Sequence, residues 1–205
     1  MTLIEFRSYF RAQLKNVYAL EECDDFLKRL MQAYFKWEPI KIGLEPNYKL
    51  TTVEEEKLEL ALIELKKERP LQYILGTTYF IDLELEVNAA VLIPRPETEE
   101  LVQWIVSDED KLNPLTILDI GTGSGCIAIS LKKAAQQWNV SALDVSEQAL
   151  DVARRNASKN EVSIQFHLED ILDKKPWLKP LDVIVSNPPY VMPSEKEQML
   201  SNVLD

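Results

Sequence analysis

The sequence predicts an α/β protein in which a helical front part precedes a parallel-sheet back part. Apolar residues recur every three or four positions through residues 1–69, which is the helical period. Four short apolar segments then alternate with helical stretches between residues 116 and 186, as in a parallel sheet covered by helices on both faces. The balance of charged residues also changes near residue 70 of the 205-residue chain. Residues 1–70 hold 12 basic and 13 acidic side chains, whereas residues 71–205 hold 11 and 21.

Composition excludes several classes of protein. A chain that is 46% hydrophobic and 28% charged is typical of a folded globular protein. It has no apolar run long enough to span a bilayer, and its first residues lack a secretory core, so we expect no membrane partner. The net charge of −11 argues against non-specific binding to nucleic acid. Two distant cysteines, Cys23 and Cys126, fit a reducing cytoplasm, and with His167 as the single histidine we expect no metal site.

The front part is expected to be a helical bundle over residues 1–70. Helical periods run through 3–20 and 26–35, and a third helix follows Thr51, whose spacing from Glu54 is that of a capping box. This helix should end before Pro70, since proline clashes with a continuing helix. The bundle shows no obvious chemistry. It is either a packing or lid domain or one that recognises a partner such as the substrate.

Residues 71–93 are expected to form a β-hairpin linker. Residues 79–81 and 83–87 have the composition and alternation of strands, Asn88 suits a turn, and a further apolar run follows at 91–93. The segment Pro94-Arg95-Pro96-Glu97-Thr98-Glu99 then leads into a helix over 97–106, where acidic residues favour the positive end of the helix dipole.

Residues 94–205 are expected to form the sheet domain. Because ligands of parallel α/β sheets bind at the carboxyl ends of the strands, the residues that follow each strand are the candidates for a site. The predicted elements are strands at 116–120, 139–144, 163–168 and 182–186, with helices at 124–136 and 146–159.

A glycine-rich loop follows the first of these strands. Glycines alternate at Gly121, Gly123 and Gly125, which allows the backbone to turn sharply and to lie against a ligand. The loop lacks the third glycine of a dinucleotide fingerprint, which would fall at Cys126, and it lacks the lysine of a phosphate loop. It is either a ligand-binding loop or only a tight turn.

Acidic residues follow the second and third strands. Asp144 can accept hydrogen bonds from the two hydroxyls of a ribose, or it can act as a helix N-cap, although Ser146 suits that role as well. Asp170 can accept a hydrogen bond from an adenine amino group with Ile171 beside the ring, or it can be a solvated loop acid.

The fourth strand ends in Asn187-Pro188-Pro189-Tyr190. Prolines remove N–H donors and stiffen the chain, so this loop presents an amide side chain, carbonyl oxygens and an aromatic face. Such a rim suits a planar nitrogen that carries two hydrogens. The Asn187 side-chain oxygen and the Pro188 carbonyl oxygen would each accept one N–H, and Tyr190 would pack against the flat group.

These motifs resemble a known family. ILDIGTGSGCIAISL, ALDVSEQALDVARRNA and VIVSNPPY, with RPLQYILG and LIPRPETEELV before them, resemble the peptide chain release factor N5-glutamine methyltransferases. These are class I S-adenosylmethionine-dependent enzymes with a Rossmann-like fold. The resemblance implies that Gly121, Thr122, Gly123, Ser124 and Gly125 hold the methionine end of S-adenosylmethionine. It also implies that Asp144 holds the ribose and that Asp170 and Ile171 border the adenine. Asn187, Pro188, Pro189 and Tyr190 would hold the glutamine of a Gly-Gly-Gln motif in the release factor, with Asn187 and Pro188 as the catalytic pair and Asn187 also beside the cofactor.

Two alternatives remain at this point. The same loop occurs in methyltransferases that act on adenine N6 in nucleic acid, although this chain is acidic and lacks a basic stripe. A cofactor-binding module without activity is the other alternative. The family continues for several strands beyond Asp205, so we expect the domain to be truncated at its C-terminus, with the fourth strand as an exposed edge.

Overall fold

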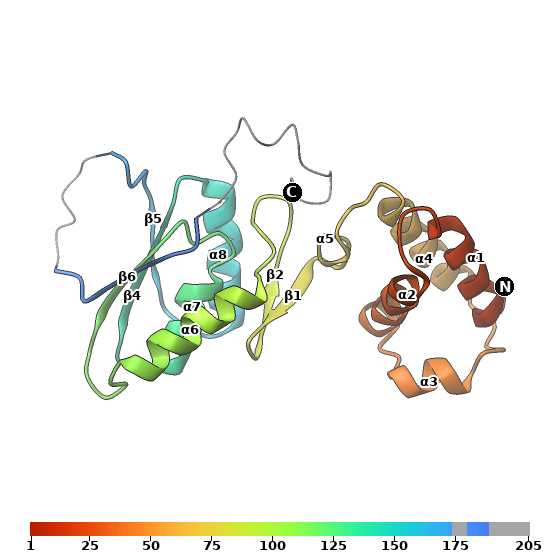
Figure 1. Ribbon diagram of the computed structural model, residues 1–205, viewed down its shortest axis with the longest axis horizontal. Helices are drawn as coiled ribbons and strands as arrows, with labels where there is room; N and C mark the ends of the chain where they lie inside the picture. The colour runs from red at the N-terminus through yellow and green to blue at the C-terminus, as the bar shows by residue number, and fades with distance from the viewer. Residues whose placement is uncertain (174–179, 189–205) are drawn as a thin grey trace. The chain divides into compact units, whose positions relative to one another are not determined.

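The computed structural model describes residues 1–173 and 180–188, which fall into two compact units. The first unit, Met1–Leu75, is helical, and the second begins at Gly76 and contains both sheets (Figure 1). Within the described ranges, no helix is both long enough and apolar enough to cross a membrane.

The helical unit contains five helices among its described residues. Its core is formed by fully buried apolar side chains such as Phe6, Phe10 and Leu30. The bundle therefore forms where the helical period predicted it. The helices are α1 (Leu3–Leu14), α2 (Leu20–Phe35), α3 (Pro39–Leu44), α4 (Thr52–Leu65) and α5 (Leu71–Leu75).

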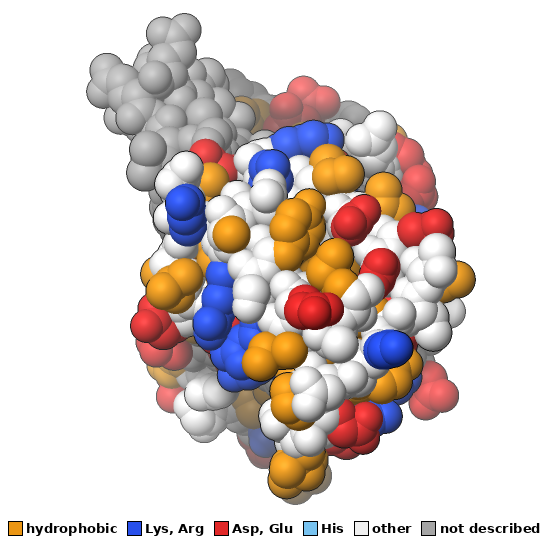
Figure 2. Space-filling model, turned by 90° about the vertical axis from the view of Figure 1, so that its right-hand side faces the viewer, with side chains coloured by type: hydrophobic (Ala, Val, Ile, Leu, Met, Phe, Trp, Pro, Cys, Tyr) orange, Lys and Arg blue, Asp and Glu red, His pale blue; other side chains and the backbone are white. Residues whose placement is uncertain are grey.

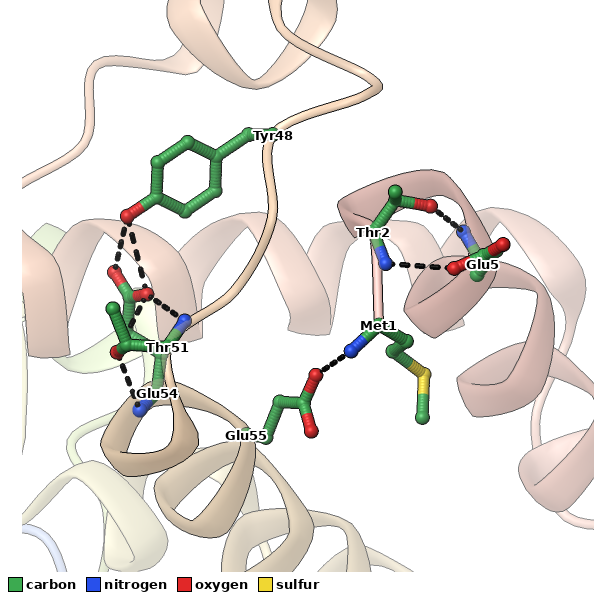
Figure 3. Close-up of polar contacts among 7 residues, drawn as sticks. All are labelled: Met1, Thr2, Glu5, Tyr48, Thr51, Glu54 and Glu55. Atoms are coloured by element: carbon green, nitrogen blue, oxygen red, sulfur yellow. Dashed lines mark hydrogen bonds and ion pairs between the residues drawn. The ribbon is translucent and has the colours of Figure 1, made fainter.

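Capping boxes fix the starts of two of these helices (Figure 3). At α4 the Thr51 hydroxyl accepts the N–H of Glu54, and the Glu54 carboxylate accepts the N–H of Thr51 in return, as its sequence spacing predicted. Thr2 and Glu5 form the same arrangement at α1. Each box satisfies N–H groups that the helix leaves without a partner.

Two short helices of this unit were not predicted. Pro39 lies in the first turn of α3, where its missing N–H costs nothing and its fixed φ favours the helix. The helix α4 ends at Leu65, before Pro70. The Pro70 carbonyl oxygen then accepts the N–H groups of Tyr73 and Ile74, which starts α5. Residues 71–75 are therefore helical, and the prediction that the linker begins at residue 71 is wrong.

The surface of the helical unit mixes charged and apolar side chains. On the face shown in Figure 2, hydrophobic, basic and acidic groups lie among one another. Exposed apolar residues of this unit include Ile40, Leu44 and Leu60. Single exposed apolar side chains are normal for a folded protein and need no special explanation.

The hairpin consists of β1 (Thr77–Phe80) and β2 (Leu83–Glu86), which pair antiparallel. Its turn is Ile81-Asp82. The predicted turn at Asn88 is present, since the Asn88 carbonyl oxygen accepts the Val91 N–H at 3.1 Å and its Oδ1 accepts the Ala90 N–H at 2.9 Å. It is not the turn of the hairpin, however, and the apolar run at 91–93 forms no strand.

The second unit is built on a parallel sheet with the strand order β5-β4-β3-β6. Its helices pack apolar side chains against the sheet, around the fully buried Ile117 and Trp138. The elements are α6 (Pro96–Asp108), β3 (Thr116–Ile120), α7 (Cys126–Ala134), β4 (Asn139–Asp144), α8 (Glu147–Lys159), β5 (Gln165–Leu168) and β6 (Val183–Ser186).

The three described helices of this unit lie on one face of the sheet (Figure 1), although the sequence predicted cover on both faces. The reason is the direction of the crossovers. From β3 to β4 to β5 the chain steps the same way across the sheet, and right-handed crossovers then place α7 and α8 on the same face. The order reverses between β3 and β6, which puts the topological switch point at their carboxyl ends. Among the described strands, β6 pairs with β3 alone and forms an edge.

Candidate active site at the sheet edge

The glycine loop joins β3 to α7, and hydrogen bonds from its backbone hold it to β4. The N–H groups of Gly121 and Thr122 donate to the Leu143 carbonyl oxygen at 2.9 and 3.0 Å. Gly125 adopts a φ of +82°, and a Cβ on it would lie 3.0 Å from Ile129 Cδ1 and 3.2 Å from Ala153 Cβ. Glycine is therefore required at this position both by the backbone and by the packing of α7 against α8.

The outer side of the loop is open, whereas its two hydroxyl side chains point inward. A Cβ on Gly121 or Gly123 would meet nothing within 4 Å. Thr122 and Ser124 are 4% and 2% exposed, and the Thr122 hydroxyl donates to Asp119 Oδ2 at 2.7 Å. The loop therefore offers a ligand its backbone rather than these side chains.

Asp119 is a fully buried carboxyl group beneath the loop. Burial raises its pKa to about 6, while hydrogen bonding to the Thr122 hydroxyl and to the backbone of Ala128 opposes the rise and the charge of Asp144 adds to it. Its Oδ1 has no hydrogen-bond partner among the described residues. A buried carboxylate whose oxygen lacks a hydrogen bond is costly in its charged form, and either protonation or a nearby positive charge would offset that cost.

The neighbouring thiol is buried in surroundings that disfavour its nucleophilic, ionised form. Cys126, the first residue of α7, is buried, and burial raises the pKa of its thiol to about 12. A thiol is nucleophilic only as the thiolate. Cys126 therefore serves as a small apolar residue in the core.

Asp144 ties the end of β4 to the glycine loop. Its Oδ2 accepts the Gly123 N–H at 2.9 Å and its Oδ1 accepts the Ser146 N–H at 3.0 Å. The N-cap of α8 is Ser146, whose hydroxyl accepts the Ala149 N–H, so the alternative of Asp144 as the cap is wrong. A carboxylate accepts about four hydrogen bonds, which leaves Asp144 capacity for a ligand.

Asp170 and Ile171 lie just beyond β5, next to the end of β4. The pairing of Asp144 with Leu168 places them at the same edge of the sheet. Asp170 Oδ1 accepts the Leu172 N–H at 2.9 Å, which fixes a turn, and the Ile171 side chain is 51% exposed. The turn leaves one carboxylate oxygen of Asp170 and the apolar Ile171 side chain facing solvent.

Asn187 follows β6 at the switch point. Because Ser186 pairs with Ile120, Asn187 lies across from Gly121, the first residue of the glycine loop. The Asn187 side chain is half-buried, and its Nδ2 donates to Thr98 Oγ1 at 2.9 Å. Pro188 is exposed. Pro189 and Tyr190 lie outside the described residues.

Two family models match this chain. The PrmC N-terminal domain matches residues 5–76, and the methyltransferase small domain matches residues 98–204, which is just over half of the chain. A release factor glutamine methyltransferase of Flavobacterium psychrophilum is 42% identical over 208 residues, covering all of this chain and 73% of the relative. The chain belongs to the release factor glutamine methyltransferase family.

Other members of the family match less of their own length. The release factor glutamine methyltransferase of Bacteroides thetaiotaomicron is 38% identical over 97% of this chain and 71% of the relative. That of Lactococcus lactis is 49% identical over 68% of this chain and 51% of the relative. The PrmC N-terminal match ends beside the boundary at Leu75, so in this methyltransferase it corresponds to the helical unit.

Three residues at or next to the candidate site were missed by the sequence reasoning. Asp119 is an acid inside an apolar strand, and Asn156 occupies a core position of α8 between Ala153 and Ala157. A polar residue at a core position is visible in the sequence, so both residues could have been recognised as candidates. Asn156 donates to the carbonyl oxygens of Ser124 and Glu86, and so holds the glycine loop to the hairpin. Thr98 belongs to a quoted motif, but nothing in the sequence shows that it contacts Asn187.

Proposed function

We propose that this methyltransferase transfers the methyl group of S-adenosylmethionine to the side-chain amide nitrogen of the glutamine in a Gly-Gly-Gln motif of peptide chain release factors, in support of translation termination. One observation carries the proposal beyond family membership. The Asn187 amide lies at the carboxyl end of β6, across from the first glycine of the loop after β3. The Asn187 amide, which would bind the substrate, and the glycine loop, which would bind the cofactor, therefore both lie at the switch point of the sheet.

The residues of the sheet edge fit S-adenosylmethionine. It supplies an electrophilic methyl group on a cationic sulfur, and it also carries an ammonium group and two ribose hydroxyls. The buried Asp119 carboxylate, with one oxygen unpartnered, favours these positive charges, and the open side of Gly121 and Gly123 leaves room for the methionine end. Asp144 would accept the ribose hydroxyls. Asp170 and Ile171 would border the adenine.

The substrate amide would be held by two oxygen acceptors. The Asn187 Oδ1 and the Pro188 carbonyl oxygen would each accept one N–H of the glutamine side chain, and the family resemblance implies that Pro189 and Tyr190 complete this substrate site. An amide nitrogen is a poor nucleophile because its lone pair is delocalised into the carbonyl group. Acceptors placed for a tetrahedral nitrogen bind the transition state better than the planar ground state, and so release that lone pair. If the nitrogen is held in line with the methyl group, the N–C bond would form as the S–C bond breaks, S-adenosylhomocysteine would be the leaving group, and the methylated nitrogen would lose one proton to water.

The helical unit and the cellular location are further parts of the proposal. The unit that precedes the hairpin, which matches the PrmC N-terminal domain, would recognise the release factor. Cys23 and Cys126 are both buried and unbridged, as expected in the reducing cytoplasm.

The test is to locate a transferred methyl group. The intact protein is incubated with a release factor and isotopically labelled S-adenosylmethionine, and the release factor is then digested and examined by mass spectrometry. We expect one labelled methyl group on the side chain of the glutamine in the Gly-Gly-Gln motif. A release factor in which that glutamine is replaced by glutamate is the control. Label at another residue, equal label in the control, or no label would contradict the proposal.

A further inference from the structure

The first turn of α6 holds the amide of Asn187. Thr98 is 5% exposed, and its Oγ1 accepts a hydrogen bond from Asn187 Nδ2 at 2.9 Å across 89 residues of sequence. We propose that Thr98 is a positioning residue for methyl transfer. By taking the NH₂ end of the Asn187 amide, it directs the oxygen of that amide toward the substrate nitrogen. This inference rests on the proposed function.

The orientation of the side-chain amide decides whether Asn187 can accept a hydrogen bond from the substrate nitrogen. An asparagine side chain carries an acceptor oxygen and a donor NH₂ group at nearly equivalent positions. With the oxygen toward the substrate, it accepts an N–H of the glutamine. With the amide turned by 180°, two NH₂ groups would face each other, so a donor would meet a donor. In the structure the NH₂ end is the one bound to Thr98 Oγ1, and this hydrogen bond holds the Asn187 side chain in the productive arrangement before the substrate arrives, which is preorganisation.

The start of α6 is anchored well enough to serve as this partner. Pro96 lies in its first turn, and Thr98 N–H donates to the Arg95 carbonyl oxygen at 3.0 Å. The next residue, Glu99, accepts the Ile81 N–H on its Oε1 at 2.9 Å. Ile81 has a φ of +53°, a strained conformation for a β-branched residue that persists only where its surroundings hold it. Neighbouring residues of one helical turn thus hold the hairpin turn and the Asn187 amide.

Two substitutions separate the hydroxyl from the shape of the side chain. Thr98→Val keeps the branched shape and removes the hydroxyl, whereas Thr98→Ser keeps the hydroxyl. In single-turnover methylation of a release factor by the intact protein, we expect Thr98→Val to lower the rate by about 10-fold or more, the effect of one lost orienting hydrogen bond. We expect Thr98→Ser to stay within about 3-fold of wild type. Affinity for S-adenosylhomocysteine should change by less than about 2-fold in both variants.

Controls keep a structural effect apart from a positioning effect. Ser107→Ala removes a hydroxyl at the other end of α6, where it donates to the Trp104 carbonyl oxygen, and should leave the rate unchanged. A rate for Thr98→Val near wild type would overturn the inference, and so would an equal loss in Thr98→Ser. A loss explained wholly by weaker cofactor binding would overturn it as well.

A second measurement stands apart from activity. The side-chain NH₂ protons of Asn187, followed by NMR in the cofactor-free protein, should exchange with solvent more slowly than those of the exposed Asn16, and Thr98→Val should make this exchange faster. If Thr98→Val does not fold, the wild-type exchange rate and the activity of Thr98→Ser decide the inference. Exchange as fast as at Asn16 would overturn it. A wild-type protein that methylates no release factor would instead overturn the proposed function, while the exchange rates would still show whether the contact exists.

Discussion

The backbone N–H of Gly123 donates to Oδ2 of Asp144 at 2.9 Å, so the acid that ends β4 holds the glycine loop that follows β3. The other oxygen of Asp144 is held by the Ser146 N–H at the start of α8. The proposed ribose acceptor and the proposed methionine loop are therefore one connected structure. A change at Asp144 should affect both.

Replacement of Asp144 tests this connection. Asp144→Ala removes the acceptor for the Gly123 N–H and for the ribose, and hydrogen bonds to a charged group contribute ~1.5–3 kcal/mol. We expect S-adenosylhomocysteine to bind about 10- to 100-fold more weakly in calorimetric titration. Asp144→Asn keeps one oxygen for the loop and should lose less affinity than alanine.

An acid outside the site provides the control for Asp144. Asp151 is exposed on α8, where it pairs with Arg154. Asp151→Ala should bind S-adenosylhomocysteine with wild-type affinity. Wild-type affinity in Asp144→Ala, or an equal loss in both alanine variants, would remove Asp144 from the cofactor site.

The buried Asp119 predicts a dependence of stability on pH. Its pKa is raised from 3.8 to about 6 in the folded, cofactor-free protein, so the folded state binds this proton more tightly than the unfolded state does. The resulting stabilisation is fully present below about pH 4 and is lost as the pH rises through about 6. A difference of about 2 pKa units corresponds to about 3 kcal/mol.

Asp119→Asn isolates this effect because it cannot ionise. The free energy of unfolding, measured by denaturant titration at pH 5 and pH 8, should fall more between these values in wild type than in Asp119→Asn. At pH 8 the variant should also bind S-adenosylhomocysteine more weakly, since it lacks the negative charge beneath the loop. Parallel pH profiles for the two proteins would contradict the assignment.

Gly125 is expected to tolerate no side chain. Gly125→Ala places a Cβ against Ile129 and Ala153 at a positive φ, which costs about 1–3 kcal/mol for the backbone alone. The matched control is Gly43→Ala in α3, where a Cβ meets nothing within 4 Å and alanine favours the helix. Thermal melts should show a lower Tm for the first variant and an equal or higher Tm for the second. Equal melting temperatures for both variants would show that the loop is not as tightly packed as described.

The fold was largely predictable from the sequence because its elements follow strong local signals. Strands 116–120 and 139–144 were predicted with the bounds that the structure has, since each is a short apolar run next to an amphipathic helix. The errors arose where a proline starts a short helix, at α3 and α5, and at the hairpin turn. A turn at Ile81 was not predictable, because a β-branched residue rarely adopts a positive φ.

The candidate site was predictable only at its strand ends. Gly121, Asp144 and Asn187 each follow a strand, and the topology of a parallel sheet brings such residues to one edge. Thr98 could not be predicted in its role, because its contact with Asn187 depends on where α6 lies against the sheet. The sequence also gave no reason to expect that the hydroxyl of Thr122 faces Asp119 rather than a ligand.

Asn187 carries the central claim, that an amide oxygen at the end of β6 binds the substrate nitrogen more tightly in the transition state. Asn187→Ala should lower the rate of transfer by about 10²–10³, the cost of one preorganised group. Asn187→Asp should retain more activity than alanine. It keeps an acceptor oxygen, and the Thr98 hydroxyl can turn to donate to the carboxylate. Asn113→Ala removes an exposed amide that contacts Asp110, and should be as active as wild type.

The most direct test is the single-turnover rate of methyl transfer to a release factor by wild type, Asn187→Ala and Asn113→Ala, with the affinity for S-adenosylhomocysteine measured on the same three proteins. We predict a rate lowered by at least about 10² in Asn187→Ala alone, with cofactor affinity within about 2-fold of wild type in all three. A near wild-type rate in Asn187→Ala, or a loss matched by an equal loss of cofactor affinity, would contradict the claim.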